Sequence, residues 1–270
     1  MARGQKPLVA ILGCGPSGLL AAHACDRYGI PFVIFSRYQK SDLGGAQFSH
    51  IPIPGLTEEI PPVELRYSVN GEASIYQEKV YESTPVPFVS FENVKDGMVV
   101  RAWNLRAIYY QLWERYAPNI ITQPEIEGKW IEKIQDSIFD IVFSSIPLIA
   151  VCRASFDMDV SHQFRSHPIR IFNQALADIP DNTIIYDGTK DHSYYRMSKI
   201  FGVGSTEWGG SSPVPPGIPL RTVHKPIATN CNCHPKIQRI GRFGTWTKGV
   251  LTMHAFNKVI DTLGVMGIDL

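Results

Sequence analysis

Near the start of the chain, Gly13-Cys14-Gly15-Pro16-Ser17-Gly18 has the spacing of a phosphate-binding turn. It lies between an apolar run, Pro7 to Leu12, and a segment of helical character, Leu19 to Cys25. In such a turn the first glycine permits the bend, the second leaves room for a pyrophosphate, and the third lets helix and strand pack closely. The helix start offers N–H groups and a positive dipole end. The pattern predicts a dinucleotide site formed by Gly13, Gly15, Pro16, Ser17 and Gly18.

The end of the next apolar run, Pro31 to Phe35, carries the residues expected beside the ribose. An acidic side chain there usually accepts the ribose hydroxyls. This sequence has Ser36, which hydrogen-bonds a hydroxyl more weakly, followed by Arg37. Arg37 suits either a 2′-phosphate, which would mean NADP, or the face of an adenine. These two residues leave the choice of cofactor open.

Three further segments resemble motifs of the flavin amine oxidase and UDP-galactopyranose mutase group. They are the glycine pair in Gly44-Gly45-Ala46, the run Phe139 to Pro147, and Gly241-Arg242-Phe243-Gly244-Thr245-Trp246 followed by Leu251-Thr252-Met253. They occur in the order of that group and reach both ends of the chain. The resemblance implies FAD, bound through Gly13, Gly15, Pro16, Ser17, Gly18, Ser36, Arg37, Gly44, Gly45, Ala46, Gly241, Arg242, Phe243, Trp246, Thr252 and Met253. Ser36 departs from the group, most of which has Glu there.

The resemblance also implies a reaction. Flavin enzymes of this group oxidise a C–N bond, and the cofactor carries the redox chemistry while the protein orients the substrate. Tyr194-Tyr195-Arg196 resembles the group's substrate-side strand, so Tyr195 and Arg196 are the candidate catalytic residues. Arg196 would clamp a carboxylate or phosphate. The competing interpretation is an arginine that pairs with a structural acid.

The elements that position these residues predict an α/β protein, with a Rossmann-type FAD-binding lobe on a parallel sheet and a small antiparallel β-rich substrate lobe. The first lobe takes residues 1–50, 101–153 and 226–270, and the second takes 51–100 and 154–225. We expect a helix over 102–116, strands over 120–122, 129–134, 139–143, 183–187 and 194–201, and a last helix over 254–263 with Thr252 as its N-cap. Asn70-Gly71 and Asp96-Gly97 each predict a hairpin, over 64–81 and 88–101.

The cysteines predict free thiols. There are five, Cys14, Cys25, Cys152, Cys231 and Cys233, which suits a reducing cytoplasm. Cys231-Asn232-Cys233-His234 invites a metal interpretation, but zinc pairs usually have two to four residues between their cysteines. We therefore assign no metal site.

Composition narrows the class of partner. The 270 residues carry 26 Lys+Arg against 25 Asp+Glu and are 44% hydrophobic, which excludes disorder. No apolar run is long enough to span a membrane. The expected substrate is a small amine or an amine-bearing polymer; a nucleic acid is one such polymer, although the net charge does not indicate it. Two alternatives remain: a redox-neutral flavin mutase or lyase acting on a sugar nucleotide or modified base, and an NADP-binding module without flavin. The oligomeric state is left open.

Overall fold

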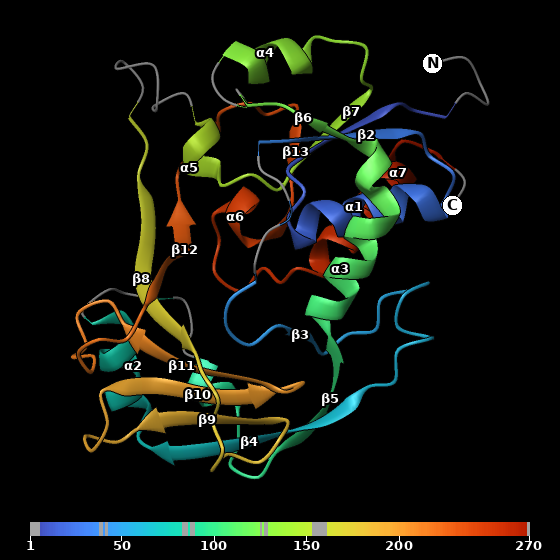
Figure 1. Ribbon diagram of the computed structural model, residues 1–270. Coiled ribbons are helices and arrows are strands. Elements are labelled where there is room, and N and C mark those ends of the chain that lie inside the picture. Colours follow the sequence, from blue (N-terminus) through green and yellow to red (C-terminus); the bar gives the residue numbers. More distant parts are fainter. Residues whose placement is uncertain are drawn as a thin grey trace. The chain divides into compact units, whose positions relative to one another are not determined.

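The computed structural model describes residues 6–37, 40, 43–82, 86, 90–124, 126, 129–152 and 161–268 (Figure 1). The chain forms two compact units. The first unit consists of Met1–Ser41, Ala107–Arg165 and Ala228–Leu270, and the second of Asp42–Arg106 and Ser166–Ile227. The units therefore alternate along the sequence. Three of the four passages of the chain between the units lie within α3 (Leu105–Tyr116), β8 (Phe164–Asn173) and β12 (Arg221–Thr229).

A five-stranded parallel sheet runs through the first unit. Its order is β13 (Ile237–Arg239), β7 (Ile141–Ser144), β1 (Val9–Leu12), β2 (Phe32–Ser36) and β6 (Ile120–Thr122). Every neighbouring pair is parallel. β1 and β7 are buried along their whole length, which explains their apolar sequences. The predicted parallel sheet is confirmed.

Helix α1 (Pro16–Arg27) follows β1 and packs against β1, β2 and α7 (His254–Val265). All its side chains from Leu19 to Cys25 are buried. Helix α3 begins three residues later than predicted because the residues before it belong to strand β5 (Val99–Asn104). The short elements of this unit are η2 (Ala117–Asn119), α5 (Leu148–Val151) and α6 (Gly241–Thr245). Among the described residues, no helix combines the length and the hydropathy that a membrane crossing needs.

One predicted strand of the first unit is a helix. Residues 129–134 lie in α4 (Lys129–Gln135). Ile131 and Ile134 are buried and three residues apart, which is the spacing of one helix face. A short apolar run fits either element, so the strand prediction was wrong here.

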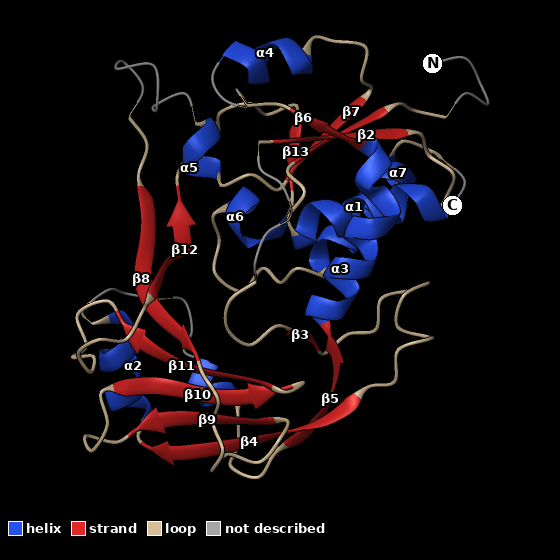
Figure 2. Cartoon of the chain, viewed as in Figure 1, coloured by secondary structure: helices blue, strands red, loops and turns tan. Residues whose placement is uncertain are grey.

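The second unit contains an eight-stranded sheet (Figure 2). Its order is β12, β8, β11 (Val203–Gly209), β10 (Tyr194–Ile200), β9 (Thr183–Gly188), β4 (Val63–Gly71), β5 and β3 (Phe48–Ser49). β4 and β9 run parallel, whereas β8–β11, β11–β10, β10–β9, β4–β5 and β5–β3 are antiparallel. The predicted strand pair over 183–187 and 194–201 is confirmed.

The two predicted hairpins are wrong in detail. After Gly71 the chain enters helix α2 (Ala73–Tyr81), in which Tyr76 and Val80 are buried one turn apart. Gly71 has φ 76°, and it pairs with Gly188 of β9 so closely that a Cβ would overlap the carbonyl oxygen of Gly188. Gly97 does turn the chain into β5, but the preceding residues form η1 (Ser90–Asn93), and Phe88 lies outside the described residues. The antiparallel sheet of this segment comes instead from β4 pairing with β5.

Candidate functional site

The first glycine of the predicted phosphate turn is held between two strands. Gly13 directly follows β1, has φ 95°, and its N–H donates to the carbonyl oxygen of Phe35 at 2.7 Å. Ser145, just after β7, donates from Oγ to the carbonyl oxygen of Leu12 at 3.1 Å. A Cβ at Gly13 would lie 2.6 Å from that Oγ. Only glycine fits this bend, because both its backbone angle and its neighbours exclude a side chain.

The other two glycines of the turn have opposite surroundings. Gly15 is the N-cap of α1, with Pro16 in the first turn and no side-chain cap hydrogen bond. A Cβ at Gly15 would meet no atom within 4 Å, whereas a Cβ at Gly18 would overlap the carbonyl oxygen of Gly13. Gly18 is therefore needed for packing, and Gly15 faces open space beside an uncapped helix start. That is the geometry in which helix N–H groups receive a phosphate.

The closing motif lies against the same helix start. Gly241, at the beginning of α6, has φ 69°, and a Cβ there would overlap Ser17 Oγ and lie 2.7 Å from Ser17 Cβ. Gly244 packs just as closely on the carbonyl oxygen of Ser144. Arg242 and Phe243 are half-buried on the same short helix. The structure thus brings the predicted residues Gly13 to Gly18 and Gly241 to Phe243 together at the carboxyl ends of β1 and β7.

The predicted ribose residues end β2 of the same sheet. Ser36 is buried, and its Oγ lies 2.8 Å from Cys14 Sγ. Burial raises the pKa of the Cys14 thiol, so a neutral thiol accompanies Ser36 at neutral pH. Arg37 is exposed. Ser36 therefore lies inside the protein, whereas Arg37 lies at its surface.

The remaining cofactor candidates of the first unit lie at the end of α6 and at the start of α7. Trp246 is buried, packs edge-on against Phe164, and donates from Nε1 to the carbonyl oxygen of Arg165 at 3.1 Å. The N-cap of α7 is the buried Met253, without a side-chain cap hydrogen bond. The assignment of Thr252 as N-cap was wrong, because Thr252 lies one residue earlier and its carbonyl oxygen accepts from the N–H of Ala255 at 3.1 Å. Its contact with a cofactor stays a prediction.

The second glycine motif lies in the second unit. Gly45 has φ 73°, and its N–H donates to Asn173 Oδ1 at 3.2 Å. Arg106 Nη2 donates to the carbonyl oxygens of Leu43 at 2.6 Å and Gly45 at 3.2 Å. Side chains from β8 and α3 thus hold the backbone of Leu43 and Gly45. A Cβ at Gly45 would lie 3.5 Å from Glu207 Oε1, so the motif also touches the ionic cluster around that carboxylate.

Glu207, on β11, accepts hydrogen bonds from both candidate catalytic residues. Tyr195 donates from its hydroxyl to Oε2 at 2.6 Å, and Arg196 donates to Oε1 from Nε at 3.0 Å and also from Nη2. Lys225 Nζ lies 3.3 Å from Oε2. The carboxylate is buried, as is Tyr195. Arg196 thus pairs with a buried acid, as the alternative interpretation of this arginine expected. Its contact with a substrate stays a prediction.

The pKa of Glu207 is set by these partners. Burial alone would raise the pKa of this carboxyl, but the charges of Arg196 and Lys225 and the hydrogen bond from Tyr195 outweigh burial and lower it to about 2. The same environment raises the pKa of Tyr195, chiefly through burial and the nearby carboxylate. Glu207 is therefore ionised and Tyr195 neutral at physiological pH.

Because Glu207 is ionised in the folded protein, we expect the folded state to lose stability at acidic pH. The folded-state pKa of Glu207 lies below its ordinary value, so the stabilisation is fully present above pH ~4.5 and is lost as pH falls toward 2. The shift corresponds to about 3 kcal/mol. Buried Asp187 contributes in the same direction, since hydrogen bonds from Lys79, Thr189 and His192 outweigh burial and lower its pKa. Urea unfolding followed by circular dichroism should give a stability that is flat from pH ~7 to ~5 and falls below that. A stability that rises on acidification would contradict the assignment.

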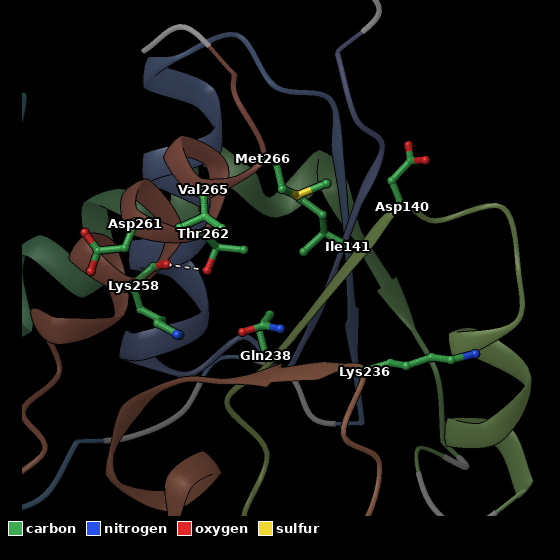
Figure 3. Close-up of a pocket in the computed structure, with 9 residues that line it drawn as sticks. All are labelled: Asp140, Ile141, Lys236, Gln238, Lys258, Asp261, Thr262, Val265 and Met266. Carbon is green, nitrogen blue, oxygen red and sulfur yellow. Dashed lines mark hydrogen bonds between the residues drawn. The ribbon is translucent and has the colours of Figure 1, made fainter. Parts of the chain in front are cut away.

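The structure also contains a pocket of about 340 Å³ in the first unit (Figure 3). Its lining residues are Asp140, Ile141, Lys236, Gln238, Lys258, Asp261, Thr262, Val265 and Met266. Ile141 begins β7, and Lys236 immediately precedes β13. Parallel α/β sheets bind ligands at the carboxyl ends of their strands. This pocket lies at the amino ends and holds none of the predicted site residues, so we assign no cofactor to it.

Sequence reasoning missed two residues that shape the site. Ser145, which holds the glycine turn, lies within the run Phe139 to Pro147, and the resemblance of that run gave Ser145 no role of its own. Glu207 carries no local signal, because its partners Tyr195 and Arg196 lie on the preceding strand and Lys225 on a later one. β11 is buried on both faces from Gly204 to Gly209, so alternation along the strand does not single out Glu207.

Comparison with known proteins supports the fold. No protein-family model and no curated protein sequence matches the chain. Among solved structures, HpxO of Klebsiella pneumoniae, complexed with FAD and uric acid, aligns with a TM-score of 0.56 and 9% identity over 99% of this chain and 81% of that one. The 2,6-dihydroxypyridine-3-hydroxylase of Arthrobacter nicotinovorans aligns at 0.53 and 11% identity, over 97% and 84%. A structural-genomics protein of Pyrococcus furiosus aligns at 0.53 and 13% identity, over 97% and 98%. At these identities the likeness concerns the fold.

Proposed function

We propose that the chain is an FAD-dependent oxidoreductase that holds the pyrophosphate of FAD at the start of α1. The observation that carries this proposal is the open space at Gly15, next to a helix start without a side-chain cap. A protein that needed glycine there only for packing would place atoms near its missing Cβ, as it does at Gly18. The fold likeness to HpxO, which was solved with FAD, supports the same cofactor.

The residues present fit a dinucleotide of this kind. The backbone of Gly13 to Gly18 would receive the pyrophosphate, and Arg242 on the adjoining α6 would add positive charge toward it. Ser36, at the end of β2, is the residue for a ribose hydroxyl. We further propose that Gly44 to Ala46 line the flavin-side loop and that Tyr195 and Arg196 face the substrate. When bound, FAD would accept two electrons from a substrate or a nicotinamide and pass them to an acceptor such as oxygen.

We also propose a class of reaction, for which there are two candidates. The sequence resemblance favours oxidation of a C–N bond in an amine or amino-acid-like group. The solved proteins named above favour oxygenation, because one was solved with uric acid and another is a hydroxypyridine hydroxylase. We place oxygenation of a planar ring first and C–N oxidation second.

Two experiments test the proposal in order. Purified protein should contain one FAD per chain, measured from its absorption spectrum and from the nucleotide released on denaturation. Anaerobic mixing should then bleach the flavin with NADH or NADPH if the protein is an oxygenase, and with an amine alone if it oxidises C–N bonds. A redox-neutral mutase would require reduced flavin and show no net oxidation. Colourless protein that takes up NADP and refuses added FAD would overturn the proposal.

A further inference from the structure

Three cysteines and a histidine converge in the first unit. Cys152 directly follows α5, His162 precedes β8, and Cys231 and Cys233 lie between β12 and β13 (Figure 1). Each offers one ligand atom, and the four ligand atoms all lie within 4.8 Å of one another. The three cysteines are buried and none forms a disulfide. Side chains from three separate stretches of sequence thus meet around one point.

Four of the six distances between these ligand atoms are close to the edges of a tetrahedron around a zinc ion, and the other two are at most 4.8 Å. Zinc–ligand bonds of their usual length place two sulfur atoms about 3.8 Å apart, and a sulfur and a nitrogen about 3.6 Å apart. Cys152 Sγ lies 3.5 Å from Cys231 Sγ and 3.9 Å from Cys233 Sγ. His162 Nδ1 lies 3.2 Å from Cys152 Sγ and 3.7 Å from Cys233 Sγ. A disulfide would need sulfur atoms about 2.05 Å apart, so none of these pairs is bonded.

The surroundings favour bound thiolates. Arg239, on β13, donates from Nη1 to the carbonyl oxygen of Cys231 at 2.8 Å and from Nη2 to that of Cys233. Its Nη2 also lies 4.0 Å from Cys231 Sγ. The guanidinium therefore fixes the backbone of the Cys-x-Cys pair and places positive charge beside it. Three thiolates and a neutral imidazole around a divalent ion leave one net negative charge, which this arginine would offset.

His234, the neighbour that the sequence first suggested as a ligand, does not belong to the cluster. Its Nε2 lies 3.1 Å from the carbonyl oxygen of Val151, and its Nδ1 lies 2.9 Å from Gln135 Nε2. Both ring nitrogens are thus engaged elsewhere. The fourth ligand is His162 instead, which the sequence spacing did not indicate.

We propose that Cys152, His162, Cys231 and Cys233 bind one zinc ion as a closed structural site. Four protein ligands leave no position for a substrate, which distinguishes this site from a catalytic zinc. Each thiol that binds as a thiolate releases its proton to solvent. The ion would fasten the end of α5 and the start of β8 to the loop that leads through β13 to Gly241. The structure confirms the predicted free cysteines, and the proposal goes beyond that prediction by giving three of them a metal, where the sequence led us to assign none.

The test begins with the metal content of the whole protein, purified without added metal. Inductively coupled plasma mass spectrometry should find about one zinc per chain. Cys152→Ser should lose most of that zinc, whereas Cys25→Ser should keep it. Cys25 is the matched control because it is fully buried in the same unit, on α1, outside the cluster. Equal zinc in the two variants would overturn the proposal.

A second measurement works on the unmutated chain and does not depend on how the variants fold. Removing the metal with a chelator should lower the midpoint of thermal unfolding, and added Zn²⁺ should restore it. Co²⁺ in place of zinc should give the intense visible absorption of tetrahedral thiolate coordination. Native protein that holds iron instead, that takes up neither Zn²⁺ nor Co²⁺, or in which mass spectrometry finds a disulfide between Cys152 and Cys231 would overturn the proposal. None of these readouts requires flavin.

Discussion

Gly15→Val is expected to give a folded protein that no longer retains FAD. Gly15 has φ −70° and ψ 177°, which valine adopts without strain, and its missing Cβ faces no atom within 4 Å. The Cβ of the new side chain would therefore meet no protein atom. It would fill the space through which a pyrophosphate approaches the start of α1. Flavin per chain should fall at least tenfold, a loss of about 1.4 kcal/mol or more in binding.

Two other glycines serve as controls for this experiment. Gly264→Val, near the end of α7, also places a side chain in open space and should keep its flavin. Gly18→Val should fail to fold, because its Cβ would overlap the carbonyl oxygen of Gly13. Flavin content and circular dichroism of the three variants separate loss of binding from loss of fold. A Gly15→Val protein with undiminished flavin would refute the proposed site.

Glu207→Gln is expected to lower the free energy of unfolding by about 3–5 kcal/mol. The substitution keeps the size of the side chain and removes its charge. Arg196 and Lys225 would then lack the carboxylate that compensates them, and Arg196 is largely buried. Removing one partner of a buried ion pair is costly because the other charge stays desolvated. The measurement is urea unfolding at neutral pH, together with the acid limb described above, which should become flatter in this variant.

An exposed ion pair provides the contrast. Lys236 and Asp136 lie 3.1 Å apart with both side chains 73% exposed. Asp136→Asn should change stability by no more than ~1 kcal/mol, as is usual for surface pairs. Adding Arg196→Met to Glu207→Gln should recover part of the loss, since the uncompensated charge is then removed. A loss at Glu207 no larger than at Asp136 would show that the cluster is weakly coupled.

The parts of the fold that could be predicted are those whose signal is local. β1, the glycine turn, α1 and β2 follow one another within about 30 residues, as in a βαβ unit. Their apolar runs and glycines each have one consistent explanation. The segment after Asn70 could not be predicted in this way, because Gly71 serves the contact between β4 and β9, whose residues lie far apart in the sequence. An Asn-Gly pair in a sequence indicates that the backbone needs a glycine there, but not which neighbouring segment leaves no room for a side chain.

The candidate site likewise contains residues that could be predicted from the sequence and residues that could not. Gly13, Gly15 and Gly18 each perform a distinct geometric task that their spacing already indicates. The family resemblance implied that Ser17 and Gly241 both bind the cofactor, but the direct contact between them was not predicted. The Glu207 cluster and the grouping of Cys152 with Cys231 could not be foreseen, because their partners meet only after the strands have paired. Cys231-x-Cys233 was set aside on its spacing, which describes only two of the four side chains.

The strand order of the parallel sheet has a consequence for synthesis on the ribosome. β1 lies in the middle of the order β13-β7-β1-β2-β6, while β13 is made last of the five. Until Ile237–Arg239 emerge, β7 is an unpaired edge with a fully buried sequence, and such edges recruit other chains. The whole β4–β12 series of the second unit emerges before that edge can be covered. The nascent chain thus exposes an unpaired apolar strand while nearly a hundred residues between β7 and β13 are synthesised. We expect chaperone binding to matter most during this interval.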